Sequence, residues 1–203
     1  MMAKLMSLFL LGLIRALTGA QARWQGCPPK AEQRIYFANH QSHVDLILMW
    51  AALPEELRSI TRPIAAKDYW TKTPFKQWIT TAVFNAIYVD RVKTGDQDPL
   101  DPLIDALGNG DSIILFPEGT RGSQEEPQKF KSGLYNLAQK FPDVVLVPAW
   151  INNVQRVMPK GEVVPVPILC SVTFGAPIAV GLEESRNDFL TRARDAVMDL
   201  RQS

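Results

Sequence analysis

Short apolar runs of strand type alternate with helical patterns along most of the chain. Runs rich in Ile, Val and Leu predict strands near positions 35, 64, 87, 113, 144 and 169, and apolar positions at helical spacing predict helices near positions 48, 77, 103, 134 and 189. Strands that alternate with helices are typical of a layered α/β fold. We therefore expect a single layered α/β domain with a mixed central sheet flanked by helices.

The carboxyl-terminal part of the chain carries the clearest helix signal. Ser185 and Asp188 have capping-box spacing, and an apolar stripe follows at Phe189, Ala193, Val197 and Leu200. We expect this helix to pack on the core. Residues 152–167, rich in Pro and Val, are expected to form an irregular loop or edge excursion.

The amino terminus shows an amphipathic pattern. Residues 5–14 are almost wholly apolar, but this run is about half of the roughly twenty residues that a membrane-spanning helix needs. On a helical wheel one narrow face holds Lys4, Ser7, Arg15 and Thr18, and the opposite face holds Leu5, Phe9, Leu13, Ala16 and Leu17. We expect residues 1–24 to form an amphipathic helix that lies in a membrane interface.

Charge supports this interpretation and leaves two alternatives open, an ordinary packed helix and a cleaved secretory signal. Residues 1–34 contain five Lys or Arg against one Glu, an excess that favours anionic lipid headgroups. A cleaved secretory signal also fits the basic start, the short apolar run and the small-residue pattern Ala20-Gln21-Ala22. Arg15 interrupts the approach to that cleavage site, so the interfacial anchor is preferred.

Composition limits the remaining possibilities. A chain of 203 residues with 46% hydrophobic content suits one domain with a sizeable core. Its net charge of +1 gives no sign of a nucleic-acid partner.

Both histidines lie in one heptapeptide, Asn39-His40-Gln41-Ser42-His43-Val44-Asp45. An imidazole accepts a proton near neutral pH, and a buried carboxylate can fix its tautomer and stabilise the imidazolium. Five residues of helix would set His40 and Asp45 about 140° apart. Their convergence therefore requires His40 in a loop and Asp45 on the following helix, and a predicted strand at residues 35–38 and a helix at residues 44–53 permit this arrangement.

Two other chemistries fit the same segment less well. Ser42, His43 and Asp45 are the residue types of a hydrolytic triad, but near neighbours rarely converge in this way, and no G-x-S-x-G elbow is present. His40, His43 and Asp45 could bind a metal, yet zinc sites usually draw a further His or Cys, and the two cysteines are single. We expect no metal and no cofactor, and His43 as a bystander.

The segment Phe116-Pro117-Glu118-Gly119-Thr120-Arg121 follows a predicted buried strand at residues 112–115. The carboxyl ends of strands are where open α/β sheets bind ligands. Arg grips phosphate with a rigid fork, Thr supplies a hydroxyl, and Gly lets the backbone approach a ligand closely. The segment therefore indicates an anion site.

Four blocks in this order resemble the glycerolipid acyltransferase family, whose best-known members are the 1-acylglycerol-3-phosphate (lysophosphatidate) acyltransferases. They are NHQSHVD at residues 39–45, FNAIYVDR at 84–91, FPEGTR at 116–121 and VPAWI at 147–151, and with lesser matches the resemblance covers roughly residues 35–180. It implies that residues 25–203 form an acyltransferase domain. Asn85 stands where such blocks usually have glycine. Asn tolerates left-handed backbone better than most residues, so we expect the turn to survive.

The resemblance implies transfer of a fatty acyl chain from an acyl thioester of coenzyme A or acyl carrier protein to the hydroxyl of a lysophospholipid, without a covalent enzyme intermediate. His40 would take the proton of the acceptor hydroxyl, and Asp45 would orient the ring. Backbone N–H groups near His40 or Gly119 would stabilise the oxyanion. The expected acceptor is 1-acylglycerol-3-phosphate, giving phosphatidate.

The resemblance also implies the substrate-binding residues. Arg121, together with Arg91 and Lys67, would bind the phosphate; Glu118, Gly119 and Thr120 would shape the pocket, and Glu118 would contact a glycerol hydroxyl. Thioester donors are made in the cytoplasm, so we expect the protein at the cytoplasmic face of the cell (inner) membrane. Another lysolipid or polar acceptor, a catalytically silent lipid-binding domain and a metal-dependent lipid hydrolase are the alternatives.

Overall fold

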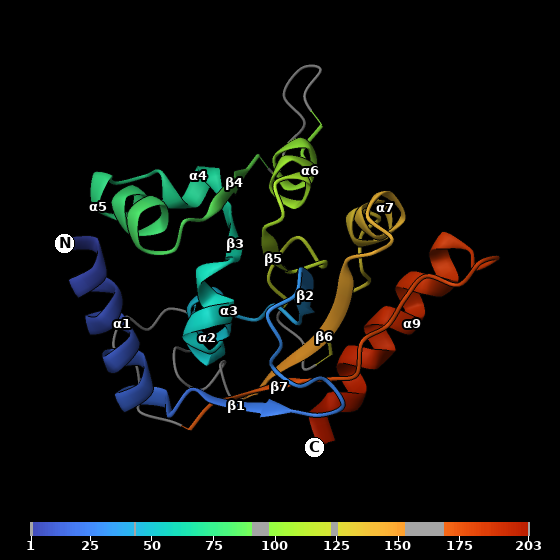
Figure 1. The fold of residues 1–203 in the computed structure, drawn as a ribbon, viewed down its shortest axis with the longest axis horizontal. Helices are drawn as coiled ribbons and strands as arrows, with labels where there is room; N and C mark the ends of the chain where they lie inside the picture. Colours follow the sequence, from blue (N-terminus) through green and yellow to red (C-terminus); the bar gives the residue numbers. More distant parts are fainter. Residues whose placement is uncertain (1, 43, 91–97, 123–125, 153–168, 203) are drawn as a thin grey trace.

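A seven-stranded sheet forms the centre of the molecule (Figure 1). The computed structural model describes residues 2–42, 44–90, 98–122, 126–152 and 169–202. The strand order is β1-β7-β6-β2-β5-β3-β4, and neighbouring strands are parallel except for the antiparallel pair β6 and β7. The strands are β1 (Gln21–Trp24), β2 (Arg34–Ala38), β3 (Thr61–Ala66), β4 (Ile87–Val89), β5 (Ser112–Leu115), β6 (Val145–Asn152) and β7 (Ser171–Phe174). The expected α/β fold with a mixed sheet is confirmed.

Helices cover both faces of this sheet. They are α1 (Met2–Thr18), α2 (Asp45–Ala52), α3 (Glu55–Ser59), α4 (Lys67–Trp70), α5 (Pro74–Trp78), the π-helix η1 (Ile79–Val83), α6 (Asp101–Gly108), α7 (Gly133–Lys140), α9 (Arg186–Asp199) and the 3-10 turn η2 (Leu200–Gln202). Alternate residues of β2 serve the two faces, because side chains along a strand point in opposite directions. Ile35 and Phe37 pack with α6, α7 and α9, whereas Tyr36 and Ala38 pack with α1 and α2.

The helix expected over residues 1–24 is shorter in the structure. α1 ends at Thr18, and Gly19 and Ala20 follow with φ angles of 69° and 36°. Residues Gln21–Trp24 then form an edge strand parallel to β7, with the Trp24 ring stacked on Phe174. Three of the four residues of β1 are exposed, so the sequence has no apolar pattern that would predict this strand. It forms because its backbone pairs with β7.

The amphipathic character of α1 is confirmed, and its apolar face points outward. Met2, Leu5, Phe9 and Leu13 have exposed fractions of 74%, 61%, 63% and 42%, whereas Leu11 on the opposite side is 8% exposed. The helix lies along the edge of the molecule beside α2 (Figure 1). Among the described helices, none combines the length and the hydropathy that a membrane span requires.

The carboxyl-terminal helix forms as predicted. The Ser185 hydroxyl accepts the N–H of Asp188 at 3.2 Å, and Phe189, Ala193 and Val197 are fully buried. The irregular segment expected over residues 152–167 lies, apart from Asn152 at the end of β6, outside the described residues.

Candidate active site

His40 and Asp45 converge as the loop-then-helix arrangement predicted. His40 follows the end of β2, and Asp45 is the first residue of α2 and is 1% exposed. The Asp45 Oδ2 atom lies 2.9 Å from His40 Nδ1 and accepts the N–H groups of Gln41 and Ser42 at 2.6 and 2.8 Å. A carboxylate is an acceptor, so this contact places the ring proton on Nδ1 and leaves Nε2 as the basic nitrogen.

The second motif holds the histidine loop in place. β2 and β5 are neighbouring parallel strands, so the segments after Ala38 and Leu115 leave the sheet at the same edge. The Phe116 ring stacks on the His40 ring, with centroids 4.4 Å apart and an angle of 18° between the planes. In addition, Gly122 donates its N–H to the His40 carbonyl at 2.8 Å. The imidazole is thereby fixed from the side of the FPEGTR segment.

Glu118 is a buried carboxylate that accepts hydrogen bonds from the His40 loop and from the segment after FPEGTR. Its Oε1 accepts the His40 N–H at 2.7 Å and its Oε2 accepts the Gln128 N–H at 2.8 Å, and the residue is 2% exposed. Burial raises the pKa of the Glu118 carboxyl, while the two backbone donors act in the opposite direction. This geometry favours the predicted shaping role of Glu118 over contact with a glycerol hydroxyl.

A third tie connects the loop to β6. The Asn39 side chain accepts the N–H of Ile151 at 2.8 Å and donates to the Ile151 carbonyl at 3.2 Å, and Asn39 is 1% exposed. The side-chain amide of Asn39 thus pairs with the backbone of β6 at the point where β2 ends, in the place of a further β2 backbone residue. The sequence suggested only a turn or cap at Asn39; the pairing with a residue more than a hundred positions away carried no local signal.

Four of the backbone N–H groups in the region expected to stabilise an oxyanion already have hydrogen-bond acceptors. The N–H groups of Gln41 and Ser42 point to Asp45, that of His40 points to Glu118, and that of Gly119 donates to the Phe116 carbonyl at 3.0 Å. These four N–H groups are therefore not available to an oxyanion in this arrangement.

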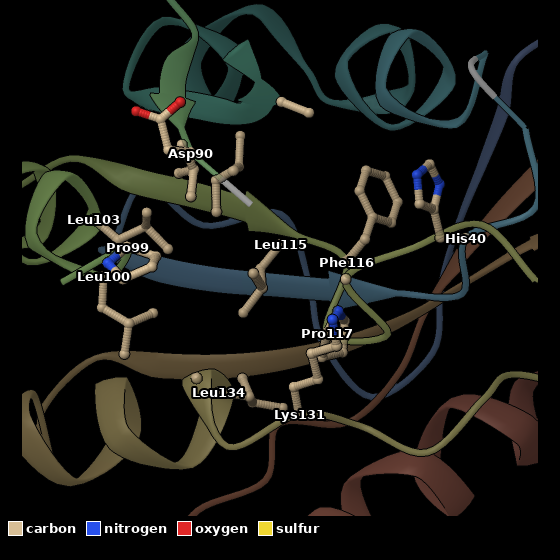
Figure 2. Close-up of a pocket in the computed structure, with 15 residues that line it drawn as sticks. His40, Asp90, Pro99, Leu100, Leu103, Leu115, Phe116, Pro117, Lys131 and Leu134 are labelled. Carbon is tan, nitrogen blue, oxygen red and sulfur yellow. The ribbon is translucent and has the colours of Figure 1, made fainter. Parts of the chain in front are cut away.

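An apolar cavity of about 240 Å³ opens beside His40. Figure 2 shows it running from His40 and Phe116, past Leu115, toward Leu100 and Leu103. Its walls come from the ends of β3, β4 and β5 and from α6 and α7, and its polar points are His40, Asp90 and Lys131. Such a lining suits a hydrocarbon chain.

A smaller recess of about 100 Å³ also adjoins His40. His40 and Arg121 both line it, together with the aromatic residues Tyr69 and Trp70 of α4. The exposed Arg121 therefore lines the same recess as the His40 ring.

The remaining predicted site residues lie around this centre. Gly119 lines the apolar cavity with a φ of 70°, and Thr120 is exposed. Lys67, predicted to bind phosphate, forms an ion pair with Asp90 at 3.2 Å, and both side chains are about half exposed. Asp90 lines the apolar cavity, whereas Lys67 does not. Arg91 and His43 lie outside the described residues.

Lys131 is a site residue that the sequence interpretation did not single out. Lys131 lines the apolar cavity. Its ammonium group lies so close to Gly119 that the Cβ of any other residue at position 119 would be 2.6 Å from it. Its place in the FKSG segment after FPEGTR was the available signal. Within the described residues, no group of three His, Cys, Asp or Glu side chains has the arrangement of a metal site.

Comparison with known proteins agrees with this site. A family model described as Acyltransferase matches residues 25–152. The chain is 30% identical over 145 residues to "Taffazin" from Dictyostelium discoideum, which covers 66% of this chain and 49% of that protein. It is 30% identical over 165 residues to "1-acyl-sn-glycerol-3-phosphate acyltransferase alpha" from Homo sapiens, covering 78% of this chain and 55% of that protein. The chain thus spans about half the length of the curated relatives it matches.

Among solved structures, the fold is similar to the 1-acyl-sn-glycerophosphate (LPA) acyltransferase PlsC from Thermotoga maritima. The TM-score is 0.74 at 22% sequence identity, over 98% of this chain and 78% of that chain. At this identity the likeness concerns the fold. The family model, however, covers well over half of the sequence and includes both motifs of the site, and so this protein belongs to the acyltransferase family.

Proposed function

We propose that this protein is an O-acyltransferase of phospholipid biosynthesis. It moves a fatty acyl chain from an acyl thioester of coenzyme A or acyl carrier protein to the free hydroxyl of a lysophospholipid, with 1-acylglycerol-3-phosphate as the acceptor and phosphatidate as the product. The observation that carries the proposal is the His40–Asp45 pair at 2.9 Å, set between an apolar cavity and an arginine-lined recess.

The chemistry follows from the ring orientation. Nε2 of His40 takes the proton of the acceptor hydroxyl while the hydroxyl oxygen attacks the thioester carbonyl. When the tetrahedral intermediate collapses, the carbon–sulfur bond breaks, and the imidazolium returns the proton to the leaving thiolate. Asp45 stabilises the imidazolium through Nδ1, and such general-base help is typically worth about 10² to 10⁴ in rate.

The two cavities beside His40 match the two chemical parts of the proposed substrates, the acyl chain and the phosphate. The apolar walls around Leu100, Leu103 and Leu115 suit an acyl chain, and the Arg121 recess suits a phosphate, since a guanidinium binds phosphate through two parallel hydrogen bonds. Both adjoin His40, so the thioester carbonyl and the hydroxyl would meet at its ring. Relatives named for 1-acyl-sn-glycerol-3-phosphate favour that acceptor, and the Taffazin relative keeps another lysolipid as the alternative.

Acyl transfer is tested with one labelled acyl thioester, offered as coenzyme A or carrier-protein adduct, and a panel of lysolipid acceptors. We expect lysophosphatidate to be preferred, chelators to have no effect, and His40→Ala to lower turnover at least about 10²-fold with folding intact. His43→Ala is the matched control and should keep near-normal turnover. Near-normal turnover of His40→Ala would refute the mechanism. No transfer to any acceptor would instead support a silent lipid-binding domain.

The exposed apolar face of α1 supports the expected membrane association. We infer that α1 lies in the interface of a bilayer, at the cytoplasmic face of the inner membrane, with Leu5 and Phe9 among the acyl chains. Cleavage after Ala22 would divide β1 and remove a helix whose Leu11 and Thr18 are buried, so a cleaved signal fits the fold poorly.

Vesicle co-sedimentation tests this inference. Leu5→Ser should weaken binding to anionic vesicles, because it removes a leucyl side chain from the interface. Leu182→Ser, which changes a fully exposed leucine elsewhere, should leave binding unaltered. Equal effects of the two substitutions, or mature protein that begins near Arg23, would contradict the anchor.

A further inference from the structure

A large cavity lies beneath α1, remote from His40. Its volume is about 530 Å³, and its walls come from α1, the end of α2, α3, η1 and the first residue of β3. β3 begins at this cavity with Thr61 and ends with Ala66 beside the His40 cavity. A strand of that length spans about 17 Å, so the two cavities are separate sites.

Positive charge gathers in this cavity beneath α1. Its lining includes Lys4, Arg15 and Arg58 against a single carboxylate, that of Glu55. Among the described residues, none of these three cations forms an ion pair. The cavity therefore carries two positive charges in excess of its acidic residue.

Arg15 of α1 and Arg58 of α3 line the same cavity. Burial lowers the pKa of Arg58 and the guanidinium of Arg15 lowers it further, whereas the carboxylate of Glu55 acts in the opposite direction. Arg58 is held in place, since it donates to the Leu53 carbonyl at 2.9 Å and lies 4.9 Å above the Trp50 ring. Like charges that line one cavity repel each other, and an anion bound in the cavity relieves this repulsion.

The rest of the lining indicates an anion attached to an apolar group. Ser7, Ser59 and Thr61 also line the cavity, and the hydroxyls of Ser59 and Thr61 donate to the Glu56 and Leu57 carbonyls. Leu8, Leu11, Val83 and Phe84 supply the apolar part of the wall. The exposed apolar face of α1 runs along the same helix. A phosphate with acyl chains matches both parts of this surface, whereas a free anion would use only the cations.

We propose that the cavity beneath α1 binds the phosphate headgroup of an anionic phospholipid at Arg15 and Arg58, as a second lipid site distinct from the catalytic one. A lipid held there places α1 and the domain in one fixed orientation at the bilayer surface. The proposal goes beyond acyl transfer, and its test needs no turnover.

The test is an NMR titration of the full chain with dihexanoyl phosphatidylglycerol, a short-chain lipid used below its micelle concentration. Saturable shifts are expected at the amides of Ser59, Thr61 and Asn85. Arg15→Gln should weaken this binding about tenfold, the loss expected for one charge-assisted hydrogen bond. The Arg15 side chain is exposed, so the variant should fold normally.

Lys140→Gln is the matched control, since it removes one exposed positive charge from α7 on the other face of the sheet. Its affinity should stay within about twofold of the parent. Equal weakening in the two variants, equally tight binding of dihexanoyl phosphatidylcholine, or shifts confined to the His40 loop would each overturn the proposal. Inorganic phosphate that binds as tightly as the lipid would assign the cavity to a free anion and overturn it as well.

Discussion

Replacement of Asp45 by Asn isolates the charge of the carboxylate from its geometry. Oδ2 accepts three donors, the Nδ1–H of His40 and the N–H groups of Gln41 and Ser42, while Oδ1 is buried without a hydrogen-bond partner among the described residues. An asparagine amide can satisfy these donors only with its oxygen at the Oδ2 position. The two backbone donors thus lock the amide, and His40 keeps the tautomer with a basic Nε2.

The expected loss is therefore electrostatic. Opposite unit charges about 4 Å apart interact by about 4 kcal/mol at an effective dielectric constant of 20, and about 1.4 kcal/mol corresponds to a tenfold change in rate. Because backbone donors also share the Asp45 charge, we expect Asp45→Asn to lower kcat by about 10² to 10³ with little change in KM. The amide nitrogen left without a partner should lower the free energy of unfolding by about 2 kcal/mol.

Steady-state kinetics with a labelled acyl thioester and lysophosphatidate measure the first quantity, and urea unfolding measures the second. Asp105→Asn, at an exposed position of α6, is the matched control and should change neither. A kcat for Asp45→Asn within about threefold of the parent would refute the claim that the carboxylate charge stabilises the imidazolium. A loss confined to KM would assign Asp45 to substrate binding instead.

Three further predictions concern the backbone and a surface ion pair. Gly119 has a φ of 70°, so Gly119→Ala should lower the free energy of unfolding, measured in urea, by about 1 to 2 kcal/mol. Gly108→Ala, at an open position of α6 without a positive φ, should be neutral or stabilising. Equal effects of the two substitutions would contradict backbone strain as the cause. Asn85→Gly should change the free energy of unfolding and the activation free energy of acyl transfer by less than about 1 kcal/mol each, because Asn85 already has a left-handed φ of 49°. A large loss of either would show that the Asn85 side chain itself is needed. The Glu184 pKa is lowered from 4.5 to about 2, chiefly by the hydrogen bond from Arg192, so the pair stabilises the fold above pH 4.5 and this contribution disappears as the pH falls toward 2. Unfolding of Glu184→Gln and the parent at pH 7 and pH 3 should show a difference of at most about 1 kcal/mol that shrinks at the lower pH, and a constant difference would rule this out.

The Asn85 turn shows how far local reasoning reaches. The family block has glycine at this position, and the preference of Asn for left-handed backbone predicted that the turn would survive; the φ of 49° confirms it. The capping pair Ser185 and Asp188 is confirmed in the same way. Both depend on a few neighbouring residues, so the sequence holds all the information that they need.

The sequence by itself determined the layered α/β fold, the His40–Asp45 pair and the family, because hydrophobic period, turn chemistry and motif order are written in short segments. Only the tertiary structure decided which partners those segments meet. Glu118 faces backbone donors of the His40 loop, Asn39 pairs with Ile151, and Gln21–Trp24 becomes a strand against β7. These contacts join residues far apart along the chain, and packing of the whole sheet selects them. Neither the apolar cavity at His40 nor the cationic one beneath α1 exists in any single segment.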